Sequence, residues 1–300
     1  MEDFVQHIIN GVSLGSIYAL IALGYTMVYG ILQLINFAHS DVYMMGAFAS
    51  YYTAMFLGRD NQPGVGTLVI LLVASMVACS LLGLVIERFC YRPLRKAPKL
   101  NILITAIGVS LFLEYFAQVV FGADPKVFPS VLNDTVLAEM NGVQLKSSDV
   151  TVLAVTVIMM LILNFVIYKT MLGKAMRATS TNMSVASLMG VNTDKIIAFT
   201  FIVGSSLAGV GSVLVGMKYP KIDPLMGMLI GLKAFVAAVL GGIGNIAGAV
   251  LGGLLMGVSE EMVVGYLSST YRDAFAFGIL IVILIFRPSG LLGKNSVEKV

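Results

Sequence analysis

Two ionisable side chains stand inside long apolar runs, and they have the clearest potential for chemistry. Glu114 lies within the run 101–121, and Lys233 lies within the shorter run 226–241. Charges are costly in lipid, so ionisable residues inside membrane segments usually face a bundle interior or a water-filled route. Two interpretations stay open. The two residues neutralise each other or have a plain structural role, or Glu114 attracts an ammonium group in transit.

A second pair of titratable residues, His39 and Asp41, stands at the start of another apolar segment. Their spacing would suit a proton relay. We favour a structural interpretation, in which Asn36 or Ser40 caps the helix that follows and His39 stays at the membrane interface.

No motif in the sequence predicts catalysis, and we expect that the chain is not an enzyme. The phosphate-binding loop G-x-x-x-x-G-K followed by Ser or Thr does not occur, so the chain cannot bind ATP by that route. The two histidines and the two cysteines are not clustered, so the sequence predicts neither a metal site nor a disulfide framework. We expect no cofactor and no nucleic-acid partner.

The composition identifies the elements that must position these residues. The chain is 58% hydrophobic and 12% charged, whereas soluble domains carry about 25% charged residues. Apolar runs of at least 18 residues recur, and each is long enough to cross about 30 Å of hydrocarbon at about 1.5 Å per residue. We therefore predict an all-α integral membrane protein, a polytopic bundle in a single domain over residues 1–300.

The apolar runs predict eight or nine transmembrane segments. The N-terminus lacks the basic region of a signal peptide, so we expect the first run to be a permanent span. The segment 226–241 is short for a full crossing, which leaves the count open. The predicted segments are 6–30, 38–57, 66–87, 101–121, 150–168, 195–217, 226–241, 246–264 and 273–287.

Basic residues gather in alternate loops, and the positive-inside rule makes their side cytoplasmic. With nine crossings the C-terminus is cytoplasmic, and we expect the outer loop 122–149, which is rich in turn signals, to form a short cap or hairpin over the outer mouth. The basic residues of the predicted cytoplasmic side are Arg88, Arg92, Arg95, Lys96, Lys99, Lys169, Lys174, Arg177, Lys195, Arg287, Lys294 and Lys299.

Glycines interrupt the apolar runs in the last third of the chain. Three glycines in Gly241–Gly244 predict a tight cytoplasmic turn, because such a run cannot hold a helix. The spacing of Gly248 with Gly252, and of Gly253 with Gly257, fits the small-residue pattern of close helix contacts.

The polar stretch 169–195 lies between two apolar runs on the predicted cytoplasmic side. Residues 175–189 have a composition that suits a helix, Gly190 would end it, and Asn192 begins a capping sequence for the next span. Such a helix either lies at the membrane surface or docks into a groove on a cytoplasmic partner.

Three separated motifs resemble the permeases of high-affinity branched-chain amino acid ABC importers, in particular the H-type subunit. The resemblance covers nearly the full length and rests on GKAMRATSTNMSVASLMGVNTDKIIAFTF from residue 173, NGVSLGSIYALIALGYTMVYGILQLINFAHSDVYMMGAF at 10–48, and VLGGIGNIAGAVLGGLLMG at 239–257. It implies that a coupling helix, about 174–190, contacts the ATPase subunit. The residues carried over from the family for that contact are Arg177, Ala186, Ser187, Leu188 and Gly190.

The resemblance also implies partners and a mechanism. They are a sister permease, two ATPase subunits that bind the ATP, and a periplasmic substrate-binding protein, all at the bacterial inner membrane. Transport would proceed by alternating access, with Glu114 and Lys233 as candidates for the translocation path. Branched-chain or other hydrophobic amino acids are the expected substrates. The family also includes urea and amide importers. A self-sufficient secondary transporter, whose intramembrane charges would form an ion path, is the alternative from another class.

Overall fold

The computed structural model describes residues 2–59, 62–95, 97–140 and 142–293. The basic residues Lys96, Lys294 and Lys299 lie outside the described residues. Within these ranges, long helices coincide with the predicted segments. They are α1 (Glu2–Leu32), α2 (His39–Phe56), α3 (Val65–Ile86), α5 (Lys99–Phe121), α6 (Ser147–Lys169), α9 (Thr193–Lys218), α10 (Met226–Gly241), α11 (Ile246–Tyr266) and α12 (Arg272–Phe286).

Seven helical segments in the described part of the chain are long and apolar enough to cross a membrane. They contain α1, α3, α5, α6, α9, α11 and α12. Helix α10 is apolar but has only 16 residues. The protein is therefore an all-α membrane protein, as the composition predicts.

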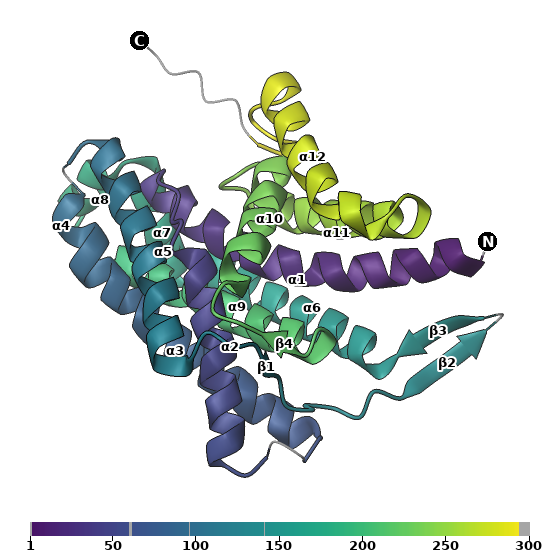
Figure 1. The fold of residues 1–300 in the computed structure, drawn as a ribbon. Coiled ribbons are helices and arrows are strands. Elements are labelled where there is room, and N and C mark those ends of the chain that lie inside the picture. Colours follow the sequence, from purple (N-terminus) through teal and green to yellow (C-terminus); the bar gives the residue numbers. More distant parts are fainter. Residues whose placement is uncertain (1, 60–61, 96, 141, 294–300) are drawn as a thin grey trace.

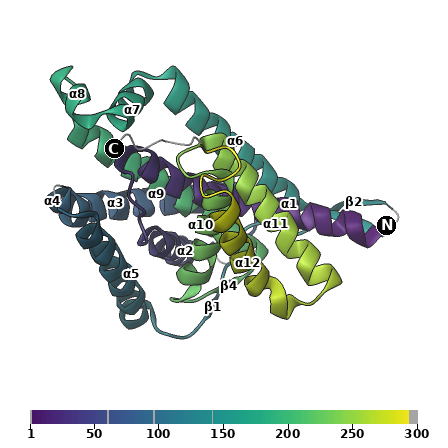
Figure 2. The same ribbon diagram turned by 90° about the horizontal axis from the view of Figure 1, so that it is seen from above.

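The short elements connect these helices and lie at two ends of the bundle. Helices α4 (Arg92–Leu94), α7 (Met171–Thr181) and α8 (Met183–Leu188) lie together at one end, here called the basic end (Figure 2). The strands β2 (Val136–Met140) and β3 (Val143–Lys146) form an antiparallel hairpin at the other end, here called the hairpin end, where the N-terminal part of α1 also lies (Figure 2).

The predicted loop 122–149 contains that hairpin, so a hairpin in this loop is confirmed. A second small sheet joins the loop to the chain after α9. Strand β1 (Lys126–Val127) pairs antiparallel with β4 (Lys221–Ile222), and Val127 stands opposite Lys221. This pairing holds the start of the loop against the segment that leads into α10.

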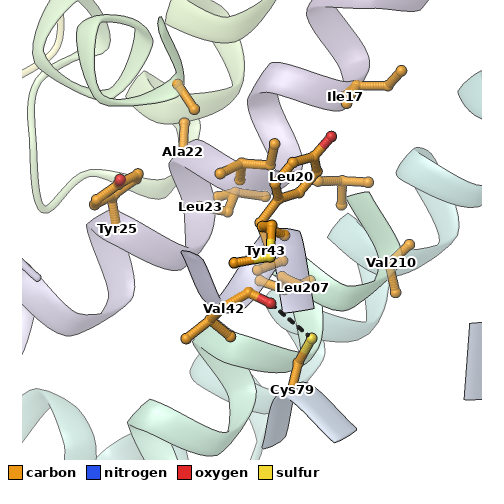
Figure 3. Close-up of a cluster of buried hydrophobic side chains, with 14 of the residues drawn as sticks. Ile17, Leu20, Ala22, Leu23, Tyr25, Val42, Tyr43, Cys79, Leu207 and Val210 are labelled. Carbon is orange, nitrogen blue, oxygen red and sulfur yellow. Dashed lines mark hydrogen bonds between the residues drawn. The ribbon is translucent and has the colours of Figure 1, made fainter. Parts of the chain in front are cut away.

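Helix α1 forms the centre of the core. Nearly every residue from Ser13 to Val28 is buried, and α6, α9, α10 and α11 pack around it. A helix that is apolar on all sides belongs in such an interior position. In Figure 3 its side chains Ile17, Leu20 and Leu23 lie among residues of α2, α3 and α9, and the thiol of Cys79 donates to the Val42 carbonyl at 3.2 Å.

The glycine ridge of α11 packs on two helices at once. A methyl group at Gly257 would collide with the backbone of Gly15 in α1, and one at Gly252 would collide with Ala237 in α10. The predicted packing role of these glycines is confirmed. The predicted turn between α10 and α11 is also confirmed, because Gly242 and Gly244 have φ values of 105° and 93°, which favour glycine.

The residues that begin α2 are buried inside the bundle. His39 is 1% exposed and lies edge-on to Tyr25, with 4.7 Å between ring centroids. The prediction that His39 stays at the interface is therefore wrong. The cap prediction is wrong, because the N-cap position of α2 is Ala38, whose side chain cannot accept a hydrogen bond from a backbone amide. Asn36 instead accepts a hydrogen bond from the Tyr91 hydroxyl at 2.9 Å, because tertiary packing brings the buried phenol to it.

Candidate functional site

Lys233 lies in a cluster of charges where α10, α11 and α12 meet. Its side chain is 7% exposed, and its Nζ lies 3.0 Å from Glu260 Oε1 and 2.6 Å from Asp273 Oδ1. The interpretation in which Lys233 pairs with Glu114 is therefore wrong. The reason is the packing order, since α10 contacts α11 and α12 whereas α5 packs against α2.

Glu260 is the centre of this cluster, here called the Lys233 cluster. Its carboxylate is 0% exposed, accepts a hydrogen bond from the Tyr18 hydroxyl at 2.9 Å, and pairs with Arg272 Nε at 2.9 Å. A buried charge persists when partners and hydrogen bonds satisfy it. Lys233 of α10, Arg272 of α12 and the Tyr18 hydroxyl of α1 supply them here. Glu261 is less buried and lies 3.7 Å from Arg272.

Glu114 lies on a different part of the bundle, beside Asp41. Glu114 is 7% exposed, and Ser110, one turn earlier on α5, donates to the fully buried Asp41 carboxylate. Ser40 also donates to that carboxylate, at 3.3 Å. Among the described residues, no ion pair involves Asp41 or Glu114. The two carboxylates therefore form an acidic region between α2 and α5.

The polar stretch 169–195 is helical, but as two helices instead of one. Helices α7 and α8 meet at Asn182, whose extended backbone breaks the helix and whose Oδ1 accepts from the Val185 amide at 3.0 Å. Asn182 thus acts as an N-cap in the middle of the segment. Gly190, with a φ of 84°, follows α8, and Asn192 caps α9, both as predicted.

The five residues carried over for an ATPase contact do not share one surface. Leu188 is 86% exposed, and Ser187 and Gly190 are exposed beside it. Ala186 is 4% exposed and faces the bundle. The Arg177 guanidinium donates to the Ile167 carbonyl and lies 5.6 Å from the centre of the Tyr168 ring.

Helix α8 presents apolar side chains to the surroundings at the basic end. Val185, Leu188 and Met189 are 53%, 86% and 80% exposed. Exposed apolar patches of this kind mark contact surfaces. We call Val185, Ser187, Leu188, Met189 and Gly190 the α8 surface.

An ion network that sequence reasoning missed follows α8 directly. Asp194, in the first turn of α9, accepts from Arg92 and from Arg95, the latter at 2.6 Å, and Arg95 also pairs with the buried Glu87. Glu87 begins a π-helical turn, Glu87–Tyr91, at the end of α3. Asp194 could be predicted only as a capping residue, since its partners lie about a hundred positions earlier in the chain.

A cavity of about 220 Å³ lies beside the Lys233 cluster. It is here called the aliphatic cavity, and its lining residues are Leu14, Tyr18, Val215, Tyr219, Lys221, Met226, Leu229, Ile230, Lys233 and Arg272. A larger polar hollow of about 480 Å³ adjoins it through Tyr219 and is lined by residues of the hairpin end, including Asp149 and Lys218. Those two side chains pair at 2.7 Å. In the described ranges, no group of three His, Cys, Asp or Glu side chains is placed to hold a metal ion.

Comparisons with known proteins cover almost the whole chain. A family model described as "Branched-chain amino acid transport system / permease component" matches residues 7–284. The high-affinity branched-chain amino acid transport system permease protein BraD of Pseudomonas aeruginosa is 43% identical over 303 residues, which cover 99% of this chain and 98% of that protein. LivH of Escherichia coli, with the same description, is 42% identical over 305 residues, with the same coverage of both chains.

Among solved structures, one described as PsaBC from Streptococcus pneumoniae in complex with Fab aligns with 96% of this chain and 91% of that one. Its identity is 14% and its TM-score is 0.46.

Proposed function

The chain belongs to the family of permease components of branched-chain amino acid transport systems, and from that premise we propose that it forms half of the membrane pathway of an ATP-driven importer. It is a multi-pass inner-membrane protein and a transport component rather than an enzyme. The observation that carries the proposal is the match to the family over residues 7–284, together with about 42% identity to permeases over nearly the full length.

The proposed complex has a sister permease, two ATPase subunits that bind ATP, and a periplasmic substrate-binding protein. Residues 1–300 form one permease domain in this proposal. The α8 surface supports the ATPase contact, because Leu188 and Met189 expose apolar area where a water-soluble partner would cover it. In this proposal the contact is the α8 surface, which contains Ser187, Leu188 and Gly190 of the residues carried over from the family. Arg177 donates to the Ile167 carbonyl and Ala186 is buried, so these two residues are proposed to hold α7 and α8 on the bundle.

We propose nine crossings with the basic end in the cytoplasm. The grouping of α4, α7 and α8 at one end, opposite the N-terminal part of α1, supports this orientation (Figure 2). An odd number of crossings would put the two ends of the chain on opposite sides of the membrane. Helices α2 and α10 complete the count, and α10, at 16 residues, is the shortest crossing apart from α12.

Alternating access would start at α8 in this proposal. ATP-driven closure of the ATPase pair moves α8, and Asp194 transmits the movement to Arg92 and Arg95 at the end of α3. The glycine contacts of α11 with α1 and α10 keep the backbones close, which suits helices that move as rigid bodies. Glu114 remains a proposed residue of the translocation path. Lys233 is proposed to contribute to that path as a member of the Lys233 cluster.

Reconstitution tests the proposal. The chain, its sister permease and the ATPase subunits are placed in proteoliposomes, and radiolabelled leucine is supplied with the binding protein. ATP-dependent leucine uptake is expected. Uptake of urea or amides in place of leucine would identify the other importer class. Uptake by this chain alone, without ATPase subunits, would favour a self-sufficient transporter and overturn the proposal.

A further inference from the structure

The walls of the aliphatic cavity combine apolar side chains with cationic ones. Leu14, Val215, Met226, Leu229 and Ile230 supply branched or flexible apolar side chains. The charged lining residues are all cations, namely Lys221, Lys233 and Arg272. Small-molecule sites typically combine apolar walls with a few placed polar groups. This cavity therefore suits a small solute that has an aliphatic part and a carboxylate.

The three cations differ in their freedom to bind such a carboxylate. Lys233 and Arg272 are already paired with Glu260, and Lys233 also with Asp273. Lys221 is exposed, and within the described residues no ion pair involves it. Strand pairing with Val127 fixes the position of Lys221. Lys221 is therefore the cation that can take an incoming anion.

Tyr219 stands beside this cation and can complete the recognition. Burial raises the pKa of Tyr219, so its hydroxyl remains protonated and can donate a hydrogen bond to a carboxylate. Tyr219 also lines the adjoining polar hollow. The hollow and the aliphatic cavity thus share Tyr219 as a wall residue.

We infer that the aliphatic cavity is an entry site of the permease for small aliphatic amino acids, with the carboxylate at Lys221 and Tyr219 and the side chain against Leu229 and Ile230. This inference rests on the proposed function and adds a place and a mode of recognition to it. The volume of about 220 Å³ lies below the range of about 300–1,000 Å³ that is usual for larger ligands. Among the described residues no carboxylate lines the cavity, so the α-ammonium group of the solute would turn toward the polar hollow, where Glu261 supplies a carboxylate. A second, basic group on the side chain would find no partner in the cavity, so amino acids with uncharged aliphatic side chains are favoured.

A steric substitution tests the cavity without disturbing the Lys233 cluster. Leu229 and Met228 are adjacent on α10 and are 52% and 57% exposed, but only Leu229 lines the cavity. Leu229→Trp would fill the space, and Met228→Trp is the matched control. With the loaded binding protein in excess, the supply of substrate is equal for all variants, so differences in uptake report on the permease.

We expect Leu229→Trp to lower leucine uptake by about tenfold, and Met228→Trp to retain the wild-type rate. Both variants should purify with the wild-type melting temperature. Lys221→Gln should raise the apparent KM for the loaded binding protein, Lys221→Arg should restore it, and Lys126→Gln on the paired strand should leave it unchanged.

The outcomes separate this inference from the proposed function. If the wild-type complex imports leucine and Leu229→Trp imports it equally well, the cavity is not an entry site, while the proposed function stands. If the wild-type complex shows no ATP-dependent uptake of leucine, urea or amides, the proposed function itself fails. ATP-dependent uptake of urea or amides without uptake of leucine overturns this inference alone. If native mass spectrometry finds a bound lipid that Leu229→Trp displaces without loss of uptake, the cavity belongs to a lipid and the inference is overturned.

Discussion

The ammonium group of Lys233 lies 3.0 Å from the carboxylate of Glu260, and this buried pair joins α10 to α11. The pair extends to Arg272 at the start of α12 and to the hydroxyl of Tyr18 on α1. Side chains from four helices therefore meet at the carboxylate of Glu260. The burial of Glu260 means that loss of its charge leaves cations without compensation, which is more costly than loss of an exposed partner.

Glu260→Gln is expected to destabilise the permease strongly. Removing one partner of a buried pair costs about 3–5 kcal/mol, and the variant should show a clearly lower Tm in detergent. Asp273→Asn is the matched control, because Asp273 contacts the same Lys233 but its side chain is 52% exposed. An exposed pair contributes about 0–1 kcal/mol, so its Tm should change little. Equal effects of the two substitutions would contradict the central role of Glu260.

Leu188→Glu is expected to weaken the contact with the ATPase subunit. Leu188 is 86% exposed on the α8 surface, so a charge there leaves the fold intact but opposes an apolar interface. Co-purification of the ATPase subunit and ATP-dependent uptake should both fall, whereas Leu188→Met should retain them. Wild-type coupling in Leu188→Glu would count against docking through α8.

Gly190 is a less informative position for the same test. Its φ of 84° requires a left-handed backbone, so any side chain there adds strain of about 1–2 kcal/mol. A loss of coupling in a Gly190 variant would therefore combine a folding effect with a contact effect. Leu188 separates the two.

Asp194→Asn is expected to reduce transport while the ATPase subunit stays bound. The substitution removes the charge that holds Arg92 and Arg95, and it leaves the α8 surface unchanged. The amount of leucine imported per ATP hydrolysed should fall several-fold if this network transmits movement from α8 to α3. Lys195→Gln, at the exposed neighbouring position, is the control. An unchanged ratio in Asp194→Asn would remove the network from the mechanism.

The sequence predicted the helices well because each long apolar run must satisfy its own backbone hydrogen bonds within lipid. The sequence also predicts the roles of Gly190, Asn192 and the Gly241–Gly244 turn, because caps and positive φ values depend on local sequence. The break at Asn182 was missed although residues 179–182 are weaker helix formers than the alanines and methionines around them, because no glycine or proline flanks this cap.

The partners of the charged residues could not be predicted in the same way. Lys233 and Glu260 are separated by a turn and most of α11, and several acidic residues were equally available by composition. Which acidic residue pairs with Lys233 depends on which helices pack together. Small residues such as Gly252 and Gly257 allow that close packing, but the sequence does not show which helices they contact. The aliphatic cavity was unpredictable for the same reason, because its lining comes from four helices and one strand.

Glu114→Gln is expected to lower uptake if Glu114 faces the translocation path. Glu114 lies beside Asp41 and Ser110, and no ion pair within the described residues neutralises it. A carboxylate in that position would attract the ammonium group of an amino acid, so its loss should slow uptake by about tenfold, and Glu114→Asp should restore part of the rate. Gln118→Glu, one turn further along α5, is a control for added charge. Unchanged uptake in Glu114→Gln would assign Glu114 a structural role.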